Sequence, residues 1–243
     1  YDQLVEELTM LSPNDELLTK VGHAIADESR KSKLPIEMAS MNKIKSMEDI
    51  EDWCRLKGIS KSEYVVITPK FDGLSLCVNE TSSEAWTRGD GEYGQKSNEH
   101  YSLIQNHLNL DEQSFSFTYG EVMMSKSTFV EKYSADFANP RNLVAGLLNS
   151  KDANSQLSDC SFIKYGAVVN KDYYSTKQDL IESLNTCQEI KVQYHICKIS
   201  DLTEELLIDL FHKFGTNYEI DGLIFTPANL AVYSYYPSMP VPI

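Results

Sequence analysis

The sequence predicts an α+β fold in which mainly antiparallel sheets are flanked by helices. Its 243 residues are 42% hydrophobic and 24% charged, which is the composition of a globular domain with an ample core. Apolar residues recur with a period of two in some segments and with a helical period in others. These two kinds of segment do not alternate strictly along the chain, which argues against a doubly wound parallel sheet.

The first part of the chain has helical patterns. Apolar residues spaced three or four apart predict a helix over residues 1–11 and another over 16–25. The polar segment 28–35 is expected to be a linker. Ser46 then begins a capping-box pattern that opens a third helix, and Gly58 is a typical helix stop.

From residue 64 onward, β-branched and aromatic runs bounded by turn residues predict strands, with amphipathic helices between them. The predicted strands cover residues 64–67, 74–78, 84–88, 115–124, 161–169, 192–199 and 221–226. The predicted helices cover residues 125–134, 140–150, 177–187 and 203–213.

Charge and cysteine content limit the classes of function. The formal net charge is −14, whereas a protein that grips the DNA backbone by itself usually has a basic surface. The five cysteines are odd in number and form no C-x-x-C pair, which argues against a zinc ribbon or a disulfide framework and predicts a reducing, cytoplasmic setting. The apolar run 143–148 is far short of the roughly 20 residues of a membrane span, so no membrane partner is expected.

Lys70-Phe71-Asp72-Gly73, expected between the first two strands, carries the most chemistry. A lysine at a strand end can act as a nucleophile when its amine is neutral, which nearby positive charge favours. The glycine would allow the backbone to approach a ligand closely. Alone, the pattern K-x-D-G also fits a turn lysine beside a strand, because it arises by chance in roughly one chain in twenty of this length.

Four further motifs add charged residues and glycines. Arg88 lies in T-R-G-D-G, whose glycines indicate a loop near a ligand, and Glu121 lies in G-E-V on a predicted strand. Arg141 lies in F-A-N-P-R-N, where the proline opens a helix with free N–H groups. Glu219 and Asp221 place two carboxylates at the start of the strand that contains I-D-G.

In this combination and order, the motifs resemble those of the adenylation domain of NAD-dependent DNA ligases, a family of lysine nucleotidyltransferases. All five family patterns occur over residues 70–222, and T-R-G-D-G and F-A-N-P-R-N are characteristic of the NAD-dependent branch. The resemblance implies the lysine-nucleotidyltransferase fold for residues 31–243, which are expected to lack the last family motif. It also implies that residues 1–30 are a remnant of the family's helical nicotinamide-mononucleotide-binding subdomain.

The N-terminal residues extend the resemblance. The start Y-D-x-L-x-x-E-L is similar to the end of the family's nicotinamide-mononucleotide-binding motif, so Tyr1 and Asp2 are expected to hold that group. The segment M-A-S-M-N resembles the family's M-L-S-L-D-N, whose Ser-Leu pair borders the adenylate. Ser40 and Met41 are the matching residues.

The resemblance implies a reaction. The Lys70 amine would attack the α-phosphorus of NAD⁺, release nicotinamide mononucleotide and keep a lysyl-adenylate, which later passes to a 5′-phosphate at a DNA nick. Asp72 would orient the lysine or help to place a cation, and Asp221 would sit near the metal or the lysine. Arg88 and Arg141 would contact phosphate or ribose.

The resemblance also implies cofactors and partners. Glu121 would accept the ribose hydroxyls. Mg²⁺ is expected because a hard cation neutralises the charge of phosphoryl transfer, with Glu121, Glu219 and Asp221 as candidate ligands. No zinc is expected in this chain. NAD is the expected co-substrate, and nicked double-stranded DNA is the expected partner, bound through domains mostly absent here.

Several positions depart from the family pattern. Thr68 stands where the family has a glutamate, Thr226 where it has a lysine, and Asn149 near a further arginine. A last phosphate-contacting lysine is expected beyond Thr226, but no lysine follows Lys213. Two alternatives therefore stay open: a nucleotidyltransferase of RNA ligase or mRNA capping type that uses ATP or GTP, and a nucleotide-binding fragment without turnover.

Overall fold

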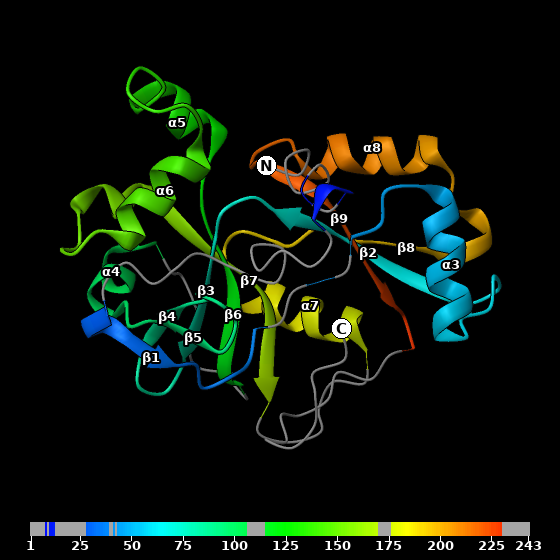
Figure 1. The fold of residues 1–243 in the computed structure, drawn as a ribbon, viewed down its shortest axis with the longest axis horizontal. Coiled ribbons are helices and arrows are strands. Elements are labelled where there is room, and N and C mark those ends of the chain that lie inside the picture. Colours follow the sequence, from blue (N-terminus) through cyan, green and yellow to red (C-terminus); the bar gives the residue numbers. More distant parts are fainter. Residues whose placement is uncertain are drawn as a thin grey trace.

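The computed structural model confirms the predicted α+β fold, with two main antiparallel sheets and helices packed against them (Figure 1). The structure describes residues 8, 10–12, 28–38, 41, 43–105, 115–169 and 176–229. The helix predicted over 16–25 and most of the helix predicted over 1–11 lie outside these residues. Every strand and helix predicted from residue 64 onward is present, and most have ends shifted by a few residues.

The smaller main sheet has three strands, and its middle strand is buried on both faces. Their order is β8 (His195–Lys198), β2 (Tyr64–Phe71) and β9 (Ile220–Pro227). One face is covered by helices α3 (Met47–Lys57) and α8 (Glu204–Phe214) (Figure 1). Val65 and Ile67 pack into this covering layer, whereas Val66 packs against the second sheet, because successive strand residues point to opposite faces.

Helix α3 begins and ends where its sequence predicts. The Ser46 hydroxyl accepts a hydrogen bond from the Asp49 N–H at 3.1 Å, and the Asp49 carboxylate accepts one from the Ser46 N–H at 3.0 Å. Gly58 closes the helix in the left-handed conformation, with φ of 68°. The capping box and the glycine stop are therefore confirmed.

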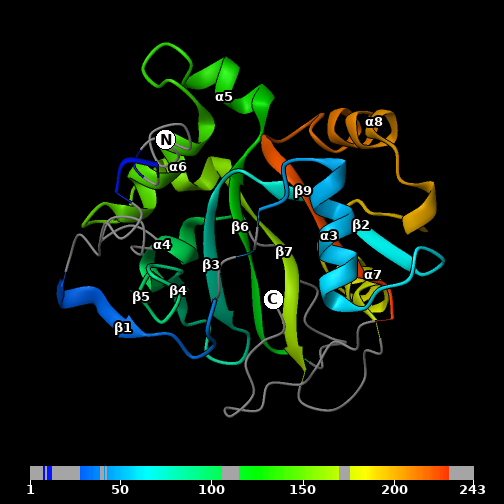
Figure 2. The same ribbon diagram turned by 45° about the vertical axis from the view of Figure 1, so that its right-hand side comes forward.

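The larger main sheet has four antiparallel strands, which run alongside one another in Figure 2. Their order is β4 (Ala85–Thr87), β3 (Leu74–Asn79), β6 (Phe115–Met124) and β7 (Cys160–Val169). Helix α6 (Pro140–Asn149) packs on one face, where Leu143 and Leu147 meet Leu76 and Val122. Helix α7 (Lys177–Cys187) packs on the other, where Ile181 shares a core with Met123 of β6 and Val66 of β2. The two sheets therefore share one buried interface.

Short peripheral elements complete the described part. They are α4 (Asn98–Leu103), α5 (Lys126–Lys132), η3 (Ser155–Asp159) and η4 (Ile199–Asp201). Among the described residues, no helix combines the length and the apolar character needed to cross a membrane.

The linker predicted over residues 28–35 is wrong. This segment forms the turn η1 (Glu28–Arg30) and the strand β1 (Lys31–Lys33), which pairs with β5 (Tyr93–Gln95). The strand was not predicted because its side chains are polar, whereas its pairing with β5 is made by backbone groups. Arg30 also donates a hydrogen bond to Ser150 O, at 2.6 Å, beyond the end of α6. Such a cation at a helix C-terminus is favourable.

Between β2 and β3, the chain passes from the smaller to the larger sheet in only two residues, Asp72 and Gly73. A Cβ atom added at Gly73 would lie 2.2 Å from Val122 O and 2.9 Å from Glu121 Cγ. Real Cβ atoms do not approach other atoms this closely. The crossing can therefore lie against β6 only because residue 73 has no side chain.

Replacing this glycine tests the crossing. We expect Gly73→Ala to lower the free energy of unfolding by about 2 kcal/mol or more, because the methyl group must displace the backbone of β6. Gly146→Ala is the matched control, since a Cβ at this exposed helical position meets nothing within 4 Å and should raise stability by about 0.5–1 kcal/mol. Both values can be measured by urea unfolding. A Gly73→Ala protein as stable as the wild type would contradict the close approach.

Candidate functional site

Lys70 lies inside β2 and not in the connection after it, which corrects the sequence-based placement. The strand continues to Phe71, and Lys70 pairs with Gly222 of β9. Alternation along β2 puts Lys70 on the same face as Val66, which packs against the larger sheet. The lysine therefore projects on the side where the two sheets meet, with 38% of its side chain exposed.

Asp221 is brought to Lys70 by an irregularity in β9. Lys70 pairs with Gly222 while Phe71 pairs with Ile220, so Asp221 is an extra residue on its strand. Such a bulge redirects a side chain out of the regular alternation. Both Asp221 oxygens accept hydrogen bonds from Lys70 Nζ, Oδ1 at 2.6 Å and Oδ2 at 2.5 Å.

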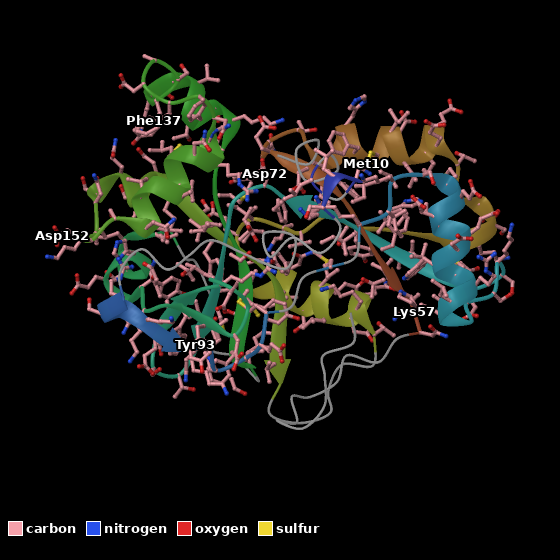
Figure 3. The ribbon with its side chains drawn as sticks, in the orientation of Figure 1. Met10, Lys57, Asp72, Tyr93, Phe137 and Asp152 are labelled. Carbon is pink, nitrogen blue, oxygen red and sulfur yellow. The ribbon has the colours of Figure 1, made fainter. Side chains whose placement is uncertain are left out.

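Asp72 and Arg141 form a second ion pair at the crossing between the sheets. Arg141, in the first turn of α6, donates from Nη1 to Asp72 Oδ1. The Asp72 N–H donates to Glu219 O at 3.0 Å, which fixes the turn after β2 to the start of β9. Figure 3 shows Asp72 near the middle of the molecule, between the two groups of elements.

Glu121 is the buried carboxylate of the site, with 7% of the residue exposed. It lies on β6 opposite Ser75 of β3. Its Oε2 accepts hydrogen bonds from Ser75 Oγ at 3.0 Å and from the Tyr165 hydroxyl at 3.1 Å. Burial raises the pKa of the Glu121 carboxyl to about 7. The hydrogen-bond donors Ser75 and Tyr165 act against this rise of the pKa. The cations Arg141 and Lys70 also act against it.

The T-R-G-D-G loop packs against the segment that precedes Ser40. Arg88 Nε donates to Met38 O at 2.9 Å, and the Met38 N–H donates to Gly91 O at 2.9 Å. Gly91 has a φ of 101°, and a Cβ there would lie 2.9 Å from Met38 O. Asp90 stabilises the loop by accepting the N–H groups of two residues that follow it. Arg88 is thus held at the border of the site.

The three carboxylates predicted to bind Mg²⁺ do not converge. Glu121 is bonded to Ser75 and Tyr165, Asp221 to Lys70, and Glu219 lies 3.3 Å from Lys126 Nζ. Within the described ranges, no three His, Cys, Asp or Glu side chains are grouped closely enough to hold a metal ion. The residues alone therefore do not form a ready magnesium cage.

The remaining predicted site residues contribute little to this geometry. Tyr1, Asp2 and Ser40 lie outside the described residues. Met41 is described and half exposed. The roles that the resemblance implies for these four residues stay predictions.

Sequence reasoning missed Ser75, Tyr165 and Lys126 as members of the site. Ser75 carried a weak signal, because a polar residue alternates there with buried apolar ones on a strand next to Lys70. Tyr165 carried none, since its contact with Glu121 depends on the pairing of β6 with β7. Lys126 reaches Glu219 from helix α5, and single-sequence patterns do not report such contacts.

Two antiparallel sheets, a lysine on a strand of one of them, carboxylates from both sheets and a guanidinium group from helix α6 are the arrangement of a lysine nucleotidyltransferase. The family model of the NAD-dependent DNA ligase adenylation domain matches residues 27–236. The chain therefore belongs to this family, and the resemblance of its five motifs is confirmed.

Two viral DNA ligases agree with this assignment. The DNA ligase of Acanthamoeba polyphaga mimivirus is 35% identical over 245 residues, covering 94% of this chain and 36% of that protein. A putative DNA ligase of Invertebrate iridescent virus 6 is 30% identical over 212 residues, covering 80% and 32%. This chain spans about a third of the length of these relatives. A solved structure of the ATP-dependent DNA ligase from bacteriophage T7 with ATP has a TM-score of 0.43 at 13% identity, covering 76% of this chain and 63% of that chain.

The buried Glu121 carboxylate makes a stability prediction. Its pKa in the folded protein, about 7, lies above its ordinary value of 4.5, so between these pH values the folded state binds more protons than the unfolded state. Stability therefore falls as pH rises through this range, and the full cost, on the order of 3 kcal/mol, is present above pH 7. We expect Glu121→Gln to raise the free energy of unfolding at pH 8 and to change it little near pH 4.5.

Urea unfolding at both pH values measures this effect. Glu131→Gln, at an exposed position on α5, is the matched control and should show no such pH-dependent gain. Equal effects of Glu121→Gln at the two pH values would show that the carboxylate is not desolvated as the structure indicates.

Proposed function

We propose that this chain performs the adenylation step of a DNA ligase, with NAD as the nucleotide donor and Lys70 as the nucleophile. The observation that carries the proposal is the contact of Lys70 Nζ with both oxygens of Asp221 at the junction of the two sheets. Membership of the NAD-dependent family supports NAD as the donor.

The proposed step exchanges one bond to phosphorus for another. The neutral Lys70 amine attacks the α-phosphorus of NAD⁺ and forms the N–P bond. The bond from this phosphorus to the oxygen bridging to nicotinamide mononucleotide breaks, and the leaving group departs with that oxygen and its electron pair. The amine proton passes to Asp221, the acceptor in direct contact with Nζ.

The surrounding residues would bind and orient the nucleotide. We assign Arg141 and Arg88 to phosphate or ribose oxygens, because a planar guanidinium suits a fixed anion. Asp72 holds Arg141 in place until the anion arrives. Glu121, whose two protein hydrogen bonds both go to Oε2, would accept the ribose hydroxyls.

We propose that Mg²⁺ binds together with the nucleotide phosphates and not in a cage of protein side chains. Mg²⁺ in phosphoryl-transfer sites usually keeps several waters and uses one or two carboxylates in addition to phosphate oxygens. The separate positions of Asp221 and Glu219, each paired with a lysine, fit this mode. The ion would neutralise charge on the phosphate oxygens.

The adenylate would next pass to a 5′-phosphate at a nick in double-stranded DNA. This transfer and the final sealing are activities of the whole protein, and this chain corresponds to about a third of its viral relatives. A second candidate function uses ATP or GTP as the donor. It is favoured by Thr68, which is buried beside the site where the family has a glutamate.

Intact mass measurement distinguishes the donors. The protein is incubated with Mg²⁺ and, separately, with NAD⁺, ATP or GTP. We expect a covalent adenylate with NAD⁺ alone and its complete loss in Lys70→Ala, because the nucleophile is removed. Lys132→Ala, which removes another ion-paired lysine far from Lys70 in the sequence, should retain the adduct. An adduct formed only from ATP or GTP would replace the proposed donor, and nucleotide binding without any adduct would indicate a fragment without turnover.

The acidic charge makes a prediction about DNA. With a formal charge of −14, residues 1–243 alone should bind a nicked duplex weakly, and the binding should fall further as salt rises, because phosphate contacts release counterions. Fluorescence anisotropy at low and at physiological ionic strength measures this. Tight binding at physiological salt would show that this chain itself holds the nick.

A further inference from the structure

One side chain, Lys126, fastens the connection between α8 and β9 to the end of the larger sheet. Lys126 is the first residue of α5, two positions after the last residue of β6. Its Nζ donates to Gly215 O at 2.7 Å and lies 3.3 Å from Glu219 Oε2. Its backbone N–H donates to Asn217 O at 3.0 Å. The contacts of this one residue therefore span the whole connection, residues 215–219.

The contact of Lys126 with Gly215 also suits the end of α8. Gly215 caps this helix, whose last residue is Phe214. The carbonyl groups at a helix C-terminus carry partial negative charge, so an ammonium group is favourable there. Lys126 thus holds the connection at its start, where the helix ends, and at Glu219, which directly precedes β9.

The bulge that carries Asp221 lies at the very start of β9. Among the described residues, a single pair of β2 and β9, Phe71 with Ile220, lies on the far side of the bulge from the rest of the strand. The Asp72 N–H then donates to Glu219 O at 3.0 Å. The extra residue of a bulge has no partner in the ladder, and this short paired stretch gives it little support. The position of Asp221 therefore depends on what fixes the chain before β9.

The ion pair of Lys126 with Glu219 suits a positioning role. Both side chains are partly exposed, 37% for the lysine and 43% for the glutamate. Such a pair adds little to the free energy of unfolding. Its removal should therefore shift the connection while the two sheets stay folded, so an effect on the site can be measured apart from an effect on stability.

We propose that Lys126 is a positioning residue for Asp221. By holding the connection 215–219, it keeps the bulge in the form that presents both Asp221 oxygens to Lys70 Nζ. The inference rests on the proposed function in one respect, the role of Asp221 as acceptor of the amine proton. It adds that the reactivity of Lys70 depends on a second lysine, whose contacts are made with the connection.

Chemical labelling of Lys70 without nucleotide tests the proposal. The 243-residue chain is treated with a trace of acetic anhydride at constant pH, and mass spectrometry of its peptides gives the labelling rate of each lysine. Lys126→Met should raise the rate for Lys70 by about three- to fivefold, the effect of losing a partly exposed ion-pair partner. The rate for Lys61, which pairs with Glu51 ahead of β2, should not change and is the internal reference.

Matched variants complete the design. Lys126→Arg keeps the charge and the donors and should restore the wild-type labelling of Lys70. Lys132→Met removes another ion-paired lysine of α5 and should leave Lys70 unchanged. Glu219→Gln removes the partner of the ion pair and should act in the same direction as Lys126→Met. In an Asp221→Asn background, Lys126→Met should add less than about twofold, because it acts through Asp221.

Adenylation gives a second measurement that separates positioning from binding. At saturating NAD⁺, the rate of adduct formation should fall by about tenfold in Lys126→Met, because a misplaced general base loses part of its usual effect. Isothermal titration calorimetry in a Lys70→Ala background gives the Kd for NAD⁺ without reaction, and this Kd should stay within about twofold. Equal losses of rate and of affinity would overturn the positioning role.

The outcomes separate this proposal from the proposed function. Unchanged labelling of Lys70 in Lys126→Met would overturn the positioning role, and so would an equal rise for Lys61, which would show that the fold had opened generally. A chain that shows the expected labelling but forms no adduct with NAD⁺ would support the positioning role and contradict the proposed activity, because labelling requires no nucleotide. An adduct in the wild type with unchanged labelling in Lys126→Met would support the proposed activity and contradict the role of Lys126.

Discussion

The close contact between Gly73 and β6 is the constraint on which the site depends. Two residues carry the chain from one sheet to the other, so the end of β2 and the start of β3 must lie next to each other. Lys70 from the first sheet and Glu121 from the second are brought together for this reason, although they are far apart in sequence. The missing side chain at Gly73 lets the crossing lie against Val122 O, so β3 begins its pairing with β6 directly after the crossing.

Two bulges then place individual side chains within this frame. Regular alternation would direct neighbouring residues to opposite faces, but Asp221 and Tyr165 are each an extra residue opposite an unbroken pair on the adjacent strand. One bulge supplies Lys70 with a carboxylate, and the other supplies Glu121 with a hydroxyl. The regular strands provide a rigid frame, and the bulges direct the Asp221 and Tyr165 side chains out of the regular alternation. Bulges occur frequently beside active sites.

The sequence predicted those parts of the protein that local patterns encode. Strand and helix positions from residue 64 onward followed from apolar periods, and the caps of α3 followed from Ser46 and Gly58. Five ordered motifs predicted the family, and the roles that they imply for the site residues stay predictions. Long-range pairing was not predictable: the strand at 31–33 has polar side chains and depends on β5, and the bulges depend on the register between strands. Ser75 and Tyr165 were missed because their contacts with Glu121 form only when β3 and β7 flank β6.

The ion pairs of the site explain how an acidic chain can receive an anionic nucleotide. Lys70 is paired with Asp221, Arg141 with Asp72, and Lys126 with Glu219, so each cation already has an acidic partner. These pairs are partly exposed, and such pairs contribute only about 0–1 kcal/mol each. A phosphate group that replaces Asp72 as the partner of Arg141 therefore loses little in the exchange. Glu121 differs because it is buried, and its hydrogen bonds and neighbouring cations offset only part of the desolvation. The exposed pairs thus allow binding at low cost, whereas the buried carboxylate is the group that we propose to accept the hydroxyls of the ligand.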